Sequence, residues 1–344
     1  MRNDLAAAFR RALQKTRASD PRGATAIIQE ALGGGARLDC GPCNAFRDAF
    51  KGPRAAQARS AWSGLSGMGA TSGKTGARAP VPEGATIEML RHDAPAGSRD
   101  YRLFMPSPRE GVPVGLVLML HGCTQSPEDF ALGTKMDLAA EAAGFVVAYP
   151  GQTGAHNMQS CWNWFRPEDQ GRDRGEPAIL ASLATSLAER FDLKGRVHVA
   201  GLSAGGAMAA VLAETHPDVF SAAGIHSGLP AGAAQDIPSA FAAMQGQAGG
   251  RAPKLPVIVF HGTADNTVSD RNARTLIPGS GVETSHTASG RSWTRLTAER
   301  SELWLVEGAG HAWFGGDPAG SYADPAGPAA SAEMLRFFAD QARD

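Results

Sequence analysis

Short apolar runs alternate with longer segments of helical periodicity from about residue 85 onward, and this alternation constrains the fold more than any other feature. The apolar runs are Tyr101–Met105, Val114–Leu120, Phe145–Tyr149, Val197–Ala200, Ala222–Ile225, Val257–Phe260 and Leu303–Val306. The helical segments are Pro127–Ala143, Glu176–Phe191, Gly205–Thr215 and Ala330–Ala342. This alternation predicts an α/β fold, with a mainly parallel sheet and helices on both of its faces. Such sheets bind their ligands at the carboxyl ends of the strands, where we therefore expect the functional residues.

Two segments of different character precede this α/β region. Residues 1–50 contain two short amphipathic stretches, broken at Asp20 and Pro21, and they predict an N-terminal helical extension. Residues 51–84 are rich in Gly, Ala, Ser and Pro and contain few large apolar side chains, which is typical of a flexible linker. The predicted organisation is therefore an extension at 1–50, a linker at 51–84 and an α/β domain at 85–344.

Composition limits the classes of partner. Hydrophobic residues make up 43% of the chain and charged residues 19%, which is typical of a globular protein, and the formal net charge is −1. A balanced charge gives no overall attraction to nucleic acid, and no apolar run is long enough to span a membrane. Arg10, Arg11 and Lys15 interrupt the apolar residues at the start, so no secretory signal peptide is visible and a cytoplasmic location is expected for the chain as written.

The pattern G-x-S-x-G occurs where a predicted strand meets a predicted helix. Gly201, Ser203 and Gly205 follow the strand that ends at Ala200, and an Ala-rich helical stretch comes next. In this context the pattern predicts a nucleophile elbow, in which the glycines make room for a very tight turn. The alternative is an ordinary helix-capping serine, but the strand before Ser203 and the helix after it favour a catalytic nucleophile.

A serine nucleophile needs a histidine base and a carboxylate to orient that base. Asp265 follows the strand that ends near Phe260, and His311 follows the strand that ends at Val306. The order Ser203, Asp265, His311 is the one that α/β-hydrolases use. Asp270 is an alternative carboxylate, although it lies further from the strand end.

The remaining histidines have simpler explanations. His121, His226 and His261 also end apolar runs, where histidines usually stabilise turns, and none has the late position that the triad order demands. Four further histidines have no companion at metal-ligand spacing: His156, His198, His216 and His286. We therefore expect no metal site, and we expect no cofactor.

An oxyanion intermediate needs two N–H donors, usually one after the nucleophile and one in the loop after an early strand. Ala204 is expected to supply the first. The strongly apolar strand that ends at Leu120 is followed by His121, Gly122 and Cys123, so the Cys123 amide is the expected second donor, with Thr124 as the alternative.

A series of motifs runs through the α/β region, in the order HGCTQSPEDF, FVVAYPGQ, CWNWF, GLSAGGAM, HGTAD, GAGHAW and DPAGPAASAEMLRFF. The series resembles the esterases of the poly(3-hydroxybutyrate) depolymerase family, which are α/β-hydrolases related to feruloyl and acetylxylan esterases. The resemblance covers about Ala85 to Phe338 and implies Ser203, Asp265 and His311 as the triad. It implies a serine esterase acting on short-chain polyhydroxyalkanoate or its oligomers, with a feruloyl or acetylxylan-type esterase as the alternative.

The resemblance also implies a disulfide between Cys123 and Cys161, although a disulfide conflicts with a cytoplasmic location. Cys40 and Cys43 form a C-x-x-C pattern without the βαβ context of a redox site, so we interpret them as a coincidence or a local structural pair.

Two further expectations concern contacts of tryptophans with substrate and docking through the N-terminal helices. Trp162, Trp164 and Trp313 are expected to contact substrate, with packing beneath loops as the alternative. A function of a different class is docking of a partner or a polymer granule through the N-terminal helices.

Overall fold

The computed structural model describes residues 77–247, 249–277 and 280–341. The predicted N-terminal extension, its proposed docking role, and all but the last residues of the predicted linker lie outside these ranges. The first strand of the described chain, β1, begins at Thr86.

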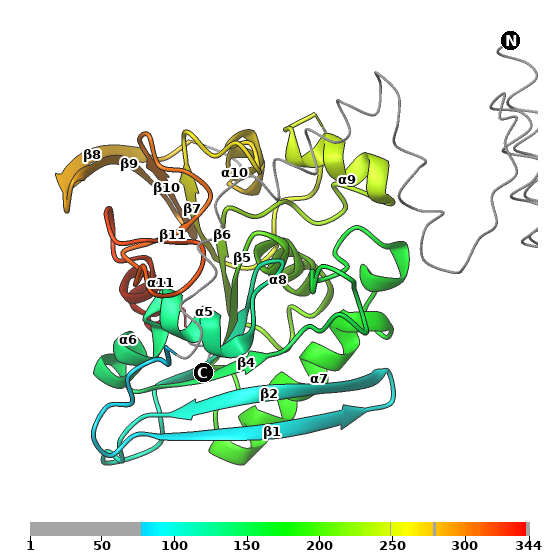
Figure 1. The fold of residues 1–344 in the computed structure, drawn as a ribbon, viewed down its shortest axis with the longest axis vertical. Coiled ribbons are helices and arrows are strands. Elements are labelled where there is room, and N and C mark those ends of the chain that lie inside the picture. Colours follow the sequence, from blue (N-terminus) through cyan, green and yellow to red (C-terminus); the bar gives the residue numbers. More distant parts are fainter. Residues whose placement is uncertain (1–76, 248, 278–279, 342–344) are drawn as a thin grey trace, which may run out of the picture. The chain divides into compact units, whose positions relative to one another are not determined.

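Ten strands of the described residues form one sheet, in the order β1-β2-β4-β3-β5-β6-β7-β10-β9-β8 (Figure 1). The strands are β1 (Thr86–Ala94), β2 (Gly97–Met105), β3 (Gly115–Leu120), β4 (Phe145–Pro150), β5 (Val197–Leu202), β6 (Ala222–His226), β7 (Val257–Gly262), β8 (Val282–Ala288), β9 (Arg291–Ala298) and β10 (Ser301–Val306). The six central strands, which are β4, β3, β5, β6, β7 and β10 in sheet order, are parallel to one another. Antiparallel strands extend the sheet on both sides, β2 and β1 beyond β4 and β9 and β8 beyond β10. This arrangement confirms the predicted mainly parallel sheet.

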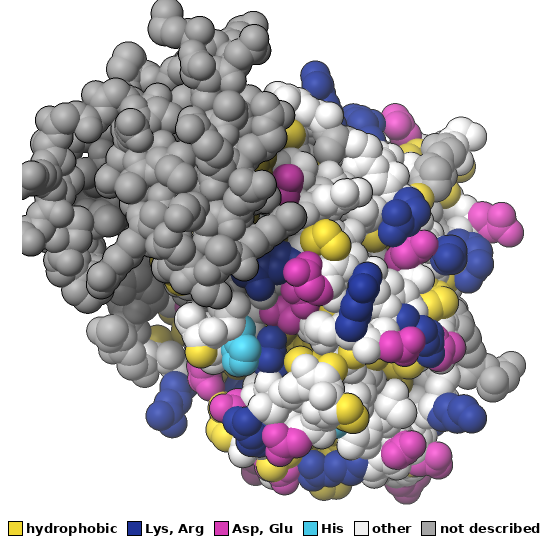
Figure 2. Space-filling view, turned by 90° about the vertical axis from the view of Figure 1, so that its right-hand side faces the viewer, with side chains coloured by type: hydrophobic (Ala, Val, Ile, Leu, Met, Phe, Trp, Pro, Cys, Tyr) yellow, Lys and Arg dark blue, Asp and Glu magenta, His cyan; other side chains and the backbone are white. Residues whose placement is uncertain are grey.

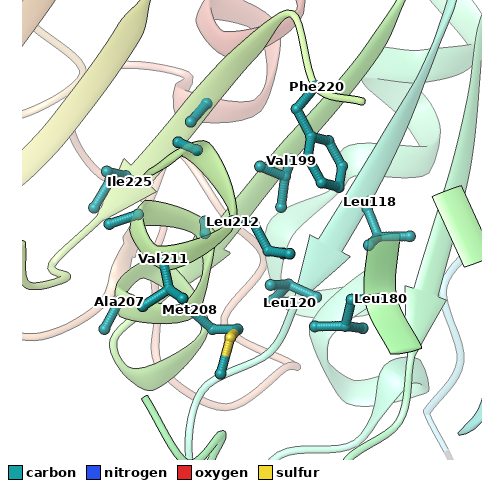
Figure 3. Close-up of a cluster of buried hydrophobic side chains, with 14 of the residues drawn as sticks. Leu118, Leu120, Leu180, Val199, Ala207, Met208, Val211, Leu212, Phe220 and Ile225 are labelled. Carbon is teal, nitrogen blue, oxygen red and sulfur yellow. The ribbon is translucent and has the colours of Figure 1, made fainter. Parts of the chain in front are cut away.

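Helices cover both faces of this sheet, as predicted. They are α5 (Pro127–Thr134), α6 (Met136–Ala143), η1 (Pro167–Asp169), α7 (Gly175–Phe191), α8 (Ala204–Thr215), α9 (Ile237–Met244), α10 (Arg271–Leu276) and α11 (Ala330–Ala339). Helices α7 and α8 pack on one face, where Leu180 and Met208 meet the strand residues Leu118, Val199 and Ile225 (Figure 3). Helices α6 and α11 pack on the other face. The parallel strands are therefore buried on both faces, which explains their unbroken apolar runs.

A second, two-stranded sheet lies after β10. Its strands are β11 (Trp313–Phe314) and β12 (Ala323–Asp324), and Trp313 pairs with Ala323. This pairing closes the segment between the two strands into a loop.

The visible surface of the described residues carries mixed charge. Lys and Arg side chains are interspersed with Asp and Glu side chains over the face in Figure 2, without a large region of one sign. Within the described ranges, the helices are too short or too polar for any of them to cross a membrane.

Candidate active site

Ser203 occupies the tight turn between β5 and α8. Its backbone has φ 57° and ψ −117°, a conformation that residues other than glycine rarely adopt. Glycines on either side are required, because a Cβ at Gly205 would lie 2.0 Å from the Leu120 carbonyl oxygen and a Cβ at Gly201 would lie 2.4 Å from the Gly205 carbonyl carbon. The Ser203 N–H donates a hydrogen bond of 2.9 Å to the carbonyl oxygen of His226. The strand, turn and helix that the motif predicts are thus present.

Asp265 and His311 are joined by a hydrogen bond. His311 Nδ1 lies 2.7 Å from Asp265 Oδ2, and the Asp265 side chain is completely buried. The other carboxylate oxygen accepts the N–H groups of Thr267 and Val268, each at 2.9 Å. The structure therefore places Asp265, and not the alternative Asp270, beside the predicted base.

Hydrogen bonds also set the charge of Asp265. Burial by itself raises the pKa of this carboxyl group, but the hydrogen bond and positive charge of His311, with His261 nearby, outweigh burial and leave the pKa below its ordinary value. Asp265 is therefore an anion at neutral pH, suited to orient His311 and to stabilise its protonated form.

His226 connects the elbow to the segment that carries His311. Its carbonyl oxygen accepts the Ser203 N–H, and its Nε2 accepts the N–H of Phe314 at 3.2 Å, three residues after His311. Because β5, β6, β7 and β10 are neighbours in the sheet, Ser203, Asp265 and His311 follow strands that end at the same edge. The structure thus brings the three predicted triad residues to one edge.

The histidines that end other strands stabilise loops, as predicted. His121 Nδ1 donates to the Gly122 carbonyl at 2.7 Å, and its Nε2 accepts the Gln152 N–H at 3.0 Å. His261 Nε2 donates to the Val268 carbonyl at 2.8 Å. Burial lowers the pKa of His121 to about 4, so this ring is neutral at pH 7.

The loop after β3 lies against the elbow. A Cβ at Gly122 would lie 3.7 Å from Ser203 Cβ. The Thr124 N–H is already used, because it donates to the Gln159 carbonyl at 2.8 Å, whereas the Cys123 N–H has no partner among the described residues. Ala204 is the first residue of α8, so its N–H has no partner within the helix. The geometry thus favours Cys123 over Thr124 as the second oxyanion donor.

A disulfide joins Cys123 to Cys161, which confirms the pairing that the family resemblance implies. Trp162, the next residue, donates from Nε1 to the His121 carbonyl at 3.1 Å. The disulfide and this hydrogen bond connect the loop between β4 and α7 to the predicted oxyanion loop at two adjacent positions.

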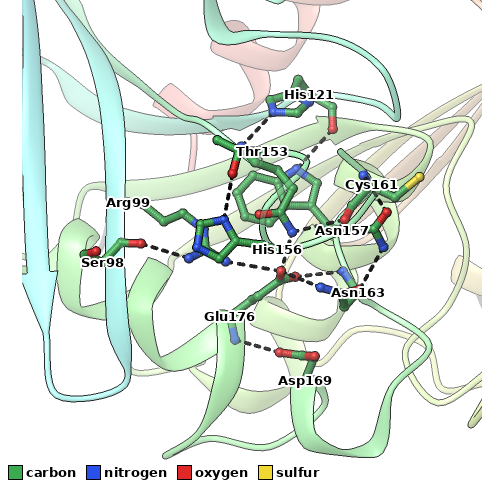
Figure 4. Close-up of polar contacts among 12 residues, drawn as sticks. Ser98, Arg99, His121, Thr153, His156, Asn157, Cys161, Asn163, Asp169 and Glu176 are labelled. Atoms are coloured by element: carbon green, nitrogen blue, oxygen red, sulfur yellow. Dashed lines mark hydrogen bonds and ion pairs between the residues drawn. The ribbon is translucent and has the colours of Figure 1, made fainter. Parts of the chain in front are cut away.

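A buried carboxylate, Glu176, organises the loop between β4 and α7 (Figure 4). It accepts hydrogen bonds from the Asn163 N–H at 2.7 Å, from Asn163 Nδ2 at 2.8 Å and from Gln152, and it forms an ion pair with Arg99 at 3.2 Å. Gln152 in turn contacts both His121 and the Cys161 carbonyl. Burial raises the pKa of Glu176 above its ordinary value.

The three tryptophans expected to contact substrate are buried in the structure, and their contact with substrate stays a prediction. Trp162, Trp164 and Trp313 are 0%, 6% and 1% exposed. Trp313 donates from Nε1 to Ser331 at 3.1 Å and stacks on His226, with ring centroids 4.9 Å apart. Their large apolar rings pack beneath the loops of the site, which was the alternative interpretation.

Three residues that shape the site were not predicted from the sequence: Gln125, Glu176 and Tyr322. Gln125 accepts the Gly122 N–H through Oε1 at 2.9 Å, and the Tyr322 ring contacts His311 edge to face. A role for Gln125 could have been predicted from the sequence, because this residue directly follows the HGCT segment. Glu176 and Tyr322 belong to no pattern that carries a known chemistry. Within the described ranges, the His, Cys, Asp and Glu side chains form no group of three or more that could hold a metal ion.

Solved structures share this architecture. An acetyl xylan esterase from Aspergillus awamori has a TM-score of 0.55 and 19% identity, covering 66% of this chain and 94% of the esterase. An S-formylglutathione hydrolase from Agrobacterium tumefaciens has a TM-score of 0.51 and 14% identity, covering 77% of this chain and 98% of that one. At such identities the likeness establishes the fold alone, and the fold is that of the α/β-hydrolases, as predicted.

Sequence comparison identifies the family within this fold. It belongs to the Esterase PHB depolymerase family, whose model matches residues 99–280. Poly(3-hydroxyalkanoate) depolymerase C of Paucimonas lemoignei is 33% identical over 174 residues, which are 46% of this chain and 42% of that protein. Feruloyl esterase B of Neurospora crassa is 30% identical over 233 residues, which are 57% of this chain and 77% of that protein. The matched stretch thus spans less than half of the Paucimonas relative.

Proposed function

We propose that the chain is a serine carboxylic-ester hydrolase that works through an acyl-enzyme. The observation that carries this proposal is the 2.7 Å hydrogen bond between Asp265 and His311, at the sheet edge where Ser203 stands in a strained turn. Strained backbone is typical of functional sites, and this combination of residues activates a serine hydroxyl in other proteins. Family membership supports the same reaction, because relatives named as depolymerases and esterases share this part of the chain.

The proposed reaction begins with proton transfer from Ser203 Oγ to His311 Nε2, while Nδ1–H donates to Asp265. The oxygen then attacks the ester carbonyl carbon, and the N–H groups of Cys123 and Ala204 stabilise the resulting oxyanion. His311 returns the proton to the leaving alcohol oxygen, which completes the acyl-enzyme. Water, deprotonated by His311, then attacks the acyl carbon, and the acid leaves as Ser203 recovers its proton.

The proposed substrates are esters of short-chain 3-hydroxyacids, as polymers or oligomers. The family and the relative named as a poly(3-hydroxyalkanoate) depolymerase support this class. The second candidate is an aromatic or acetyl ester of a plant polysaccharide, because other relatives are named as feruloyl and acetylxylan esterases.

Replacement of the nucleophile tests the proposed reaction. Ser203→Ala is expected to lower kcat for p-nitrophenyl butyrate by about a millionfold, as in other triads, because no other group can form the acyl-enzyme. Thermal unfolding serves as the control for folding. Near-native turnover by a folded Ser203→Ala variant would sink the mechanism, and covalent labelling by a fluorophosphonate at another residue would move the nucleophile there.

A substrate panel tests the proposed class. The wild type is compared on a suspension of poly(3-hydroxybutyrate), on 3-hydroxybutyrate oligomers, on methyl ferulate and on acetylated xylan, with the Ser203→Ala variant as blank. Larger kcat/KM on the hydroxyacid esters supports the proposal. Larger kcat/KM on ferulate or acetylated xylan replaces it with the second candidate.

A further inference from the structure

Tyr322 stands in a strained backbone conformation beside the proposed base. Its φ is 51°, in the left-handed region that a bulky residue rarely adopts, and its carbonyl oxygen accepts the Trp313 N–H at 2.7 Å. The side chain is only partly buried. Such strain persists only where the surrounding contacts enforce it, and it is concentrated at functional sites.

The contacts that enforce this conformation also hold the oxyanion loop. The residue before Tyr322, Ser321, donates its N–H to Asp129 Oδ1 at 2.9 Å, and its carbonyl oxygen accepts Gln125 Nε2 at 3.0 Å. The other end of the same Gln125 amide accepts the Gly122 N–H at 2.9 Å. One side chain therefore fixes the position of Tyr322 relative to the loop that carries Cys123.

The Tyr322 side chain lies between the base and this loop. Its ring meets the His311 ring edge to face, with centroids 6.4 Å apart and planes at 81°. Its hydroxyl lies 3.5 Å from Thr124 Oγ1, which already donates its own proton to the Cys123 carbonyl at 2.6 Å. A hydroxyl hydrogen bond is usually 2.5–3.0 Å long, so the Tyr322 O–H has only a long contact and remains able to donate to a ligand.

The reaction geometry determines which part of the substrate meets this hydroxyl. In the proposed mechanism His311 returns its proton to the leaving alcohol oxygen, so groups beside its ring border the alcohol part of the ester. In an ester of linked 3-hydroxyacids, that alcohol carries its own carbonyl group, which is separated from the leaving oxygen by two carbon atoms. A simple alkyl alcohol carries no such acceptor.

We propose that Tyr322 is a specificity-determining residue that donates a hydrogen bond to a carbonyl oxygen in the alcohol part of the ester. The residue would thereby favour esters of hydroxyacids over esters of simple alcohols. This inference rests on the proposed function, since it assigns the alcohol subsite of the same reaction.

The test compares Tyr322→Phe with the wild type on two esters of 3-hydroxybutyrate. One is the methyl ester of the 3-hydroxybutyrate dimer, monitored through the release of methyl 3-hydroxybutyrate from its internal ester, so that the leaving alcohol carries a carbonyl group. The other is the sec-butyl ester, whose leaving alcohol lacks a carbonyl group. The variant is expected to lose about three- to tenfold in kcat/KM on the dimer ester, the usual worth of one neutral hydrogen bond, and less than twofold on the sec-butyl ester. Tyr101→Phe, which removes a hydroxyl from a buried tyrosine of β2, is the matched control and is expected to change neither value.

Each other outcome overturns the inference in a recognisable way. Equal losses on both esters would assign Tyr322 to the positioning of His311, and no loss on either would remove it from the subsite. If the wild type cleaves p-nitrophenyl butyrate but neither hydroxyacid ester, the proposed substrate class and this subsite both fail while the esterase mechanism stands. A lower melting temperature of Tyr322→Phe with equal losses would indicate a purely structural role.

Discussion

At the scale of single residues, the site depends on backbone conformations that residues other than glycine rarely adopt. Ser203 and Tyr322 both have positive φ, and such a conformation costs about 1–3 kcal/mol for a residue other than glycine. The sequence could predict the first, because Gly201 and Gly205 are needed for the close approach of backbone around Ser203. It could not predict the second, because the conformation of Tyr322 depends on a hydrogen bond from Gln125, a distant residue in the sequence, to the carbonyl oxygen of the neighbouring Ser321.

The choice between two neighbouring carboxylates is a prediction at this scale. Asp265→Asn is expected to lower kcat by about four orders of magnitude, because an amide cannot support the required His311 tautomer or its charge. Asp270→Asn is the matched control and is expected to retain activity, because His311 hydrogen-bonds to Asp265. Initial rates with p-nitrophenyl butyrate measure both variants. The reverse ranking would assign the carboxylate role to Asp270 and leave the esterase proposal in place.

At the scale of elements, burial decides what the sequence could predict. The central strands were predicted because both faces are buried and their residues are apolar throughout. Strand β8 was missed because all its residues are exposed, so no apolar pattern marks it. The predicted helix Pro127–Ala143 is two helices, because Lys135 adopts a left-handed conformation between α5 and α6. Its apolar pattern continues across that break.

The loop elements of the site depend on the Cys123–Cys161 disulfide, which closes a loop with a sequence separation of 38. In the chain-entropy model this closure stabilises the fold by about 4 kcal/mol. The double variant Cys123→Ser with Cys161→Ser is therefore expected to unfold at lower urea concentration. It is also expected to show a lower kcat, because the bridge holds the loop whose backbone N–H at residue 123 is the proposed oxyanion donor.

A background with Cys40→Ser and Cys43→Ser isolates this effect, since only the bridge then differs between the two proteins. Added reductant should lower the stability of the bridged form and leave the double variant unchanged. Peptide mapping after alkylation without reductant checks the bridge directly. Two alkylatable thiols at Cys123 and Cys161 in the air-exposed enzyme would show that the disulfide does not form.

At the scale of the whole molecule, three buried histidines make folding dependent on pH. His121, His226 and His261 are completely buried at the strand ends that surround the site. Burial is the largest cause that lowers the pKa of each ring, to about 4 for His121. The folded protein therefore keeps these rings neutral at a pH where the unfolded chain, with histidine pKa near 6.5, already binds protons.

The free energy of unfolding is expected to be highest above pH 6.5 and to fall as the pH drops from there towards 4. The sign follows because the unfolded state binds more protons than the folded state in this window. His121 alone accounts for a loss of about 3 kcal/mol across it, at up to about 1.4 kcal/mol per pH unit. Asp265 adds a loss at lower pH, below the ordinary pKa of an aspartate, because its own pKa is depressed.

Urea unfolding between pH 7.5 and 4.5 measures this dependence. His121→Gln should flatten the curve, because it removes one of the groups that bind a proton only on unfolding, even though the loss of two hydrogen bonds lowers stability at every pH. His286→Gln is the matched control, since His286 is exposed on β8, and it should leave the slope unchanged. A wild-type stability that stays constant or rises on acidification would show that the three rings are not held neutral in the folded protein.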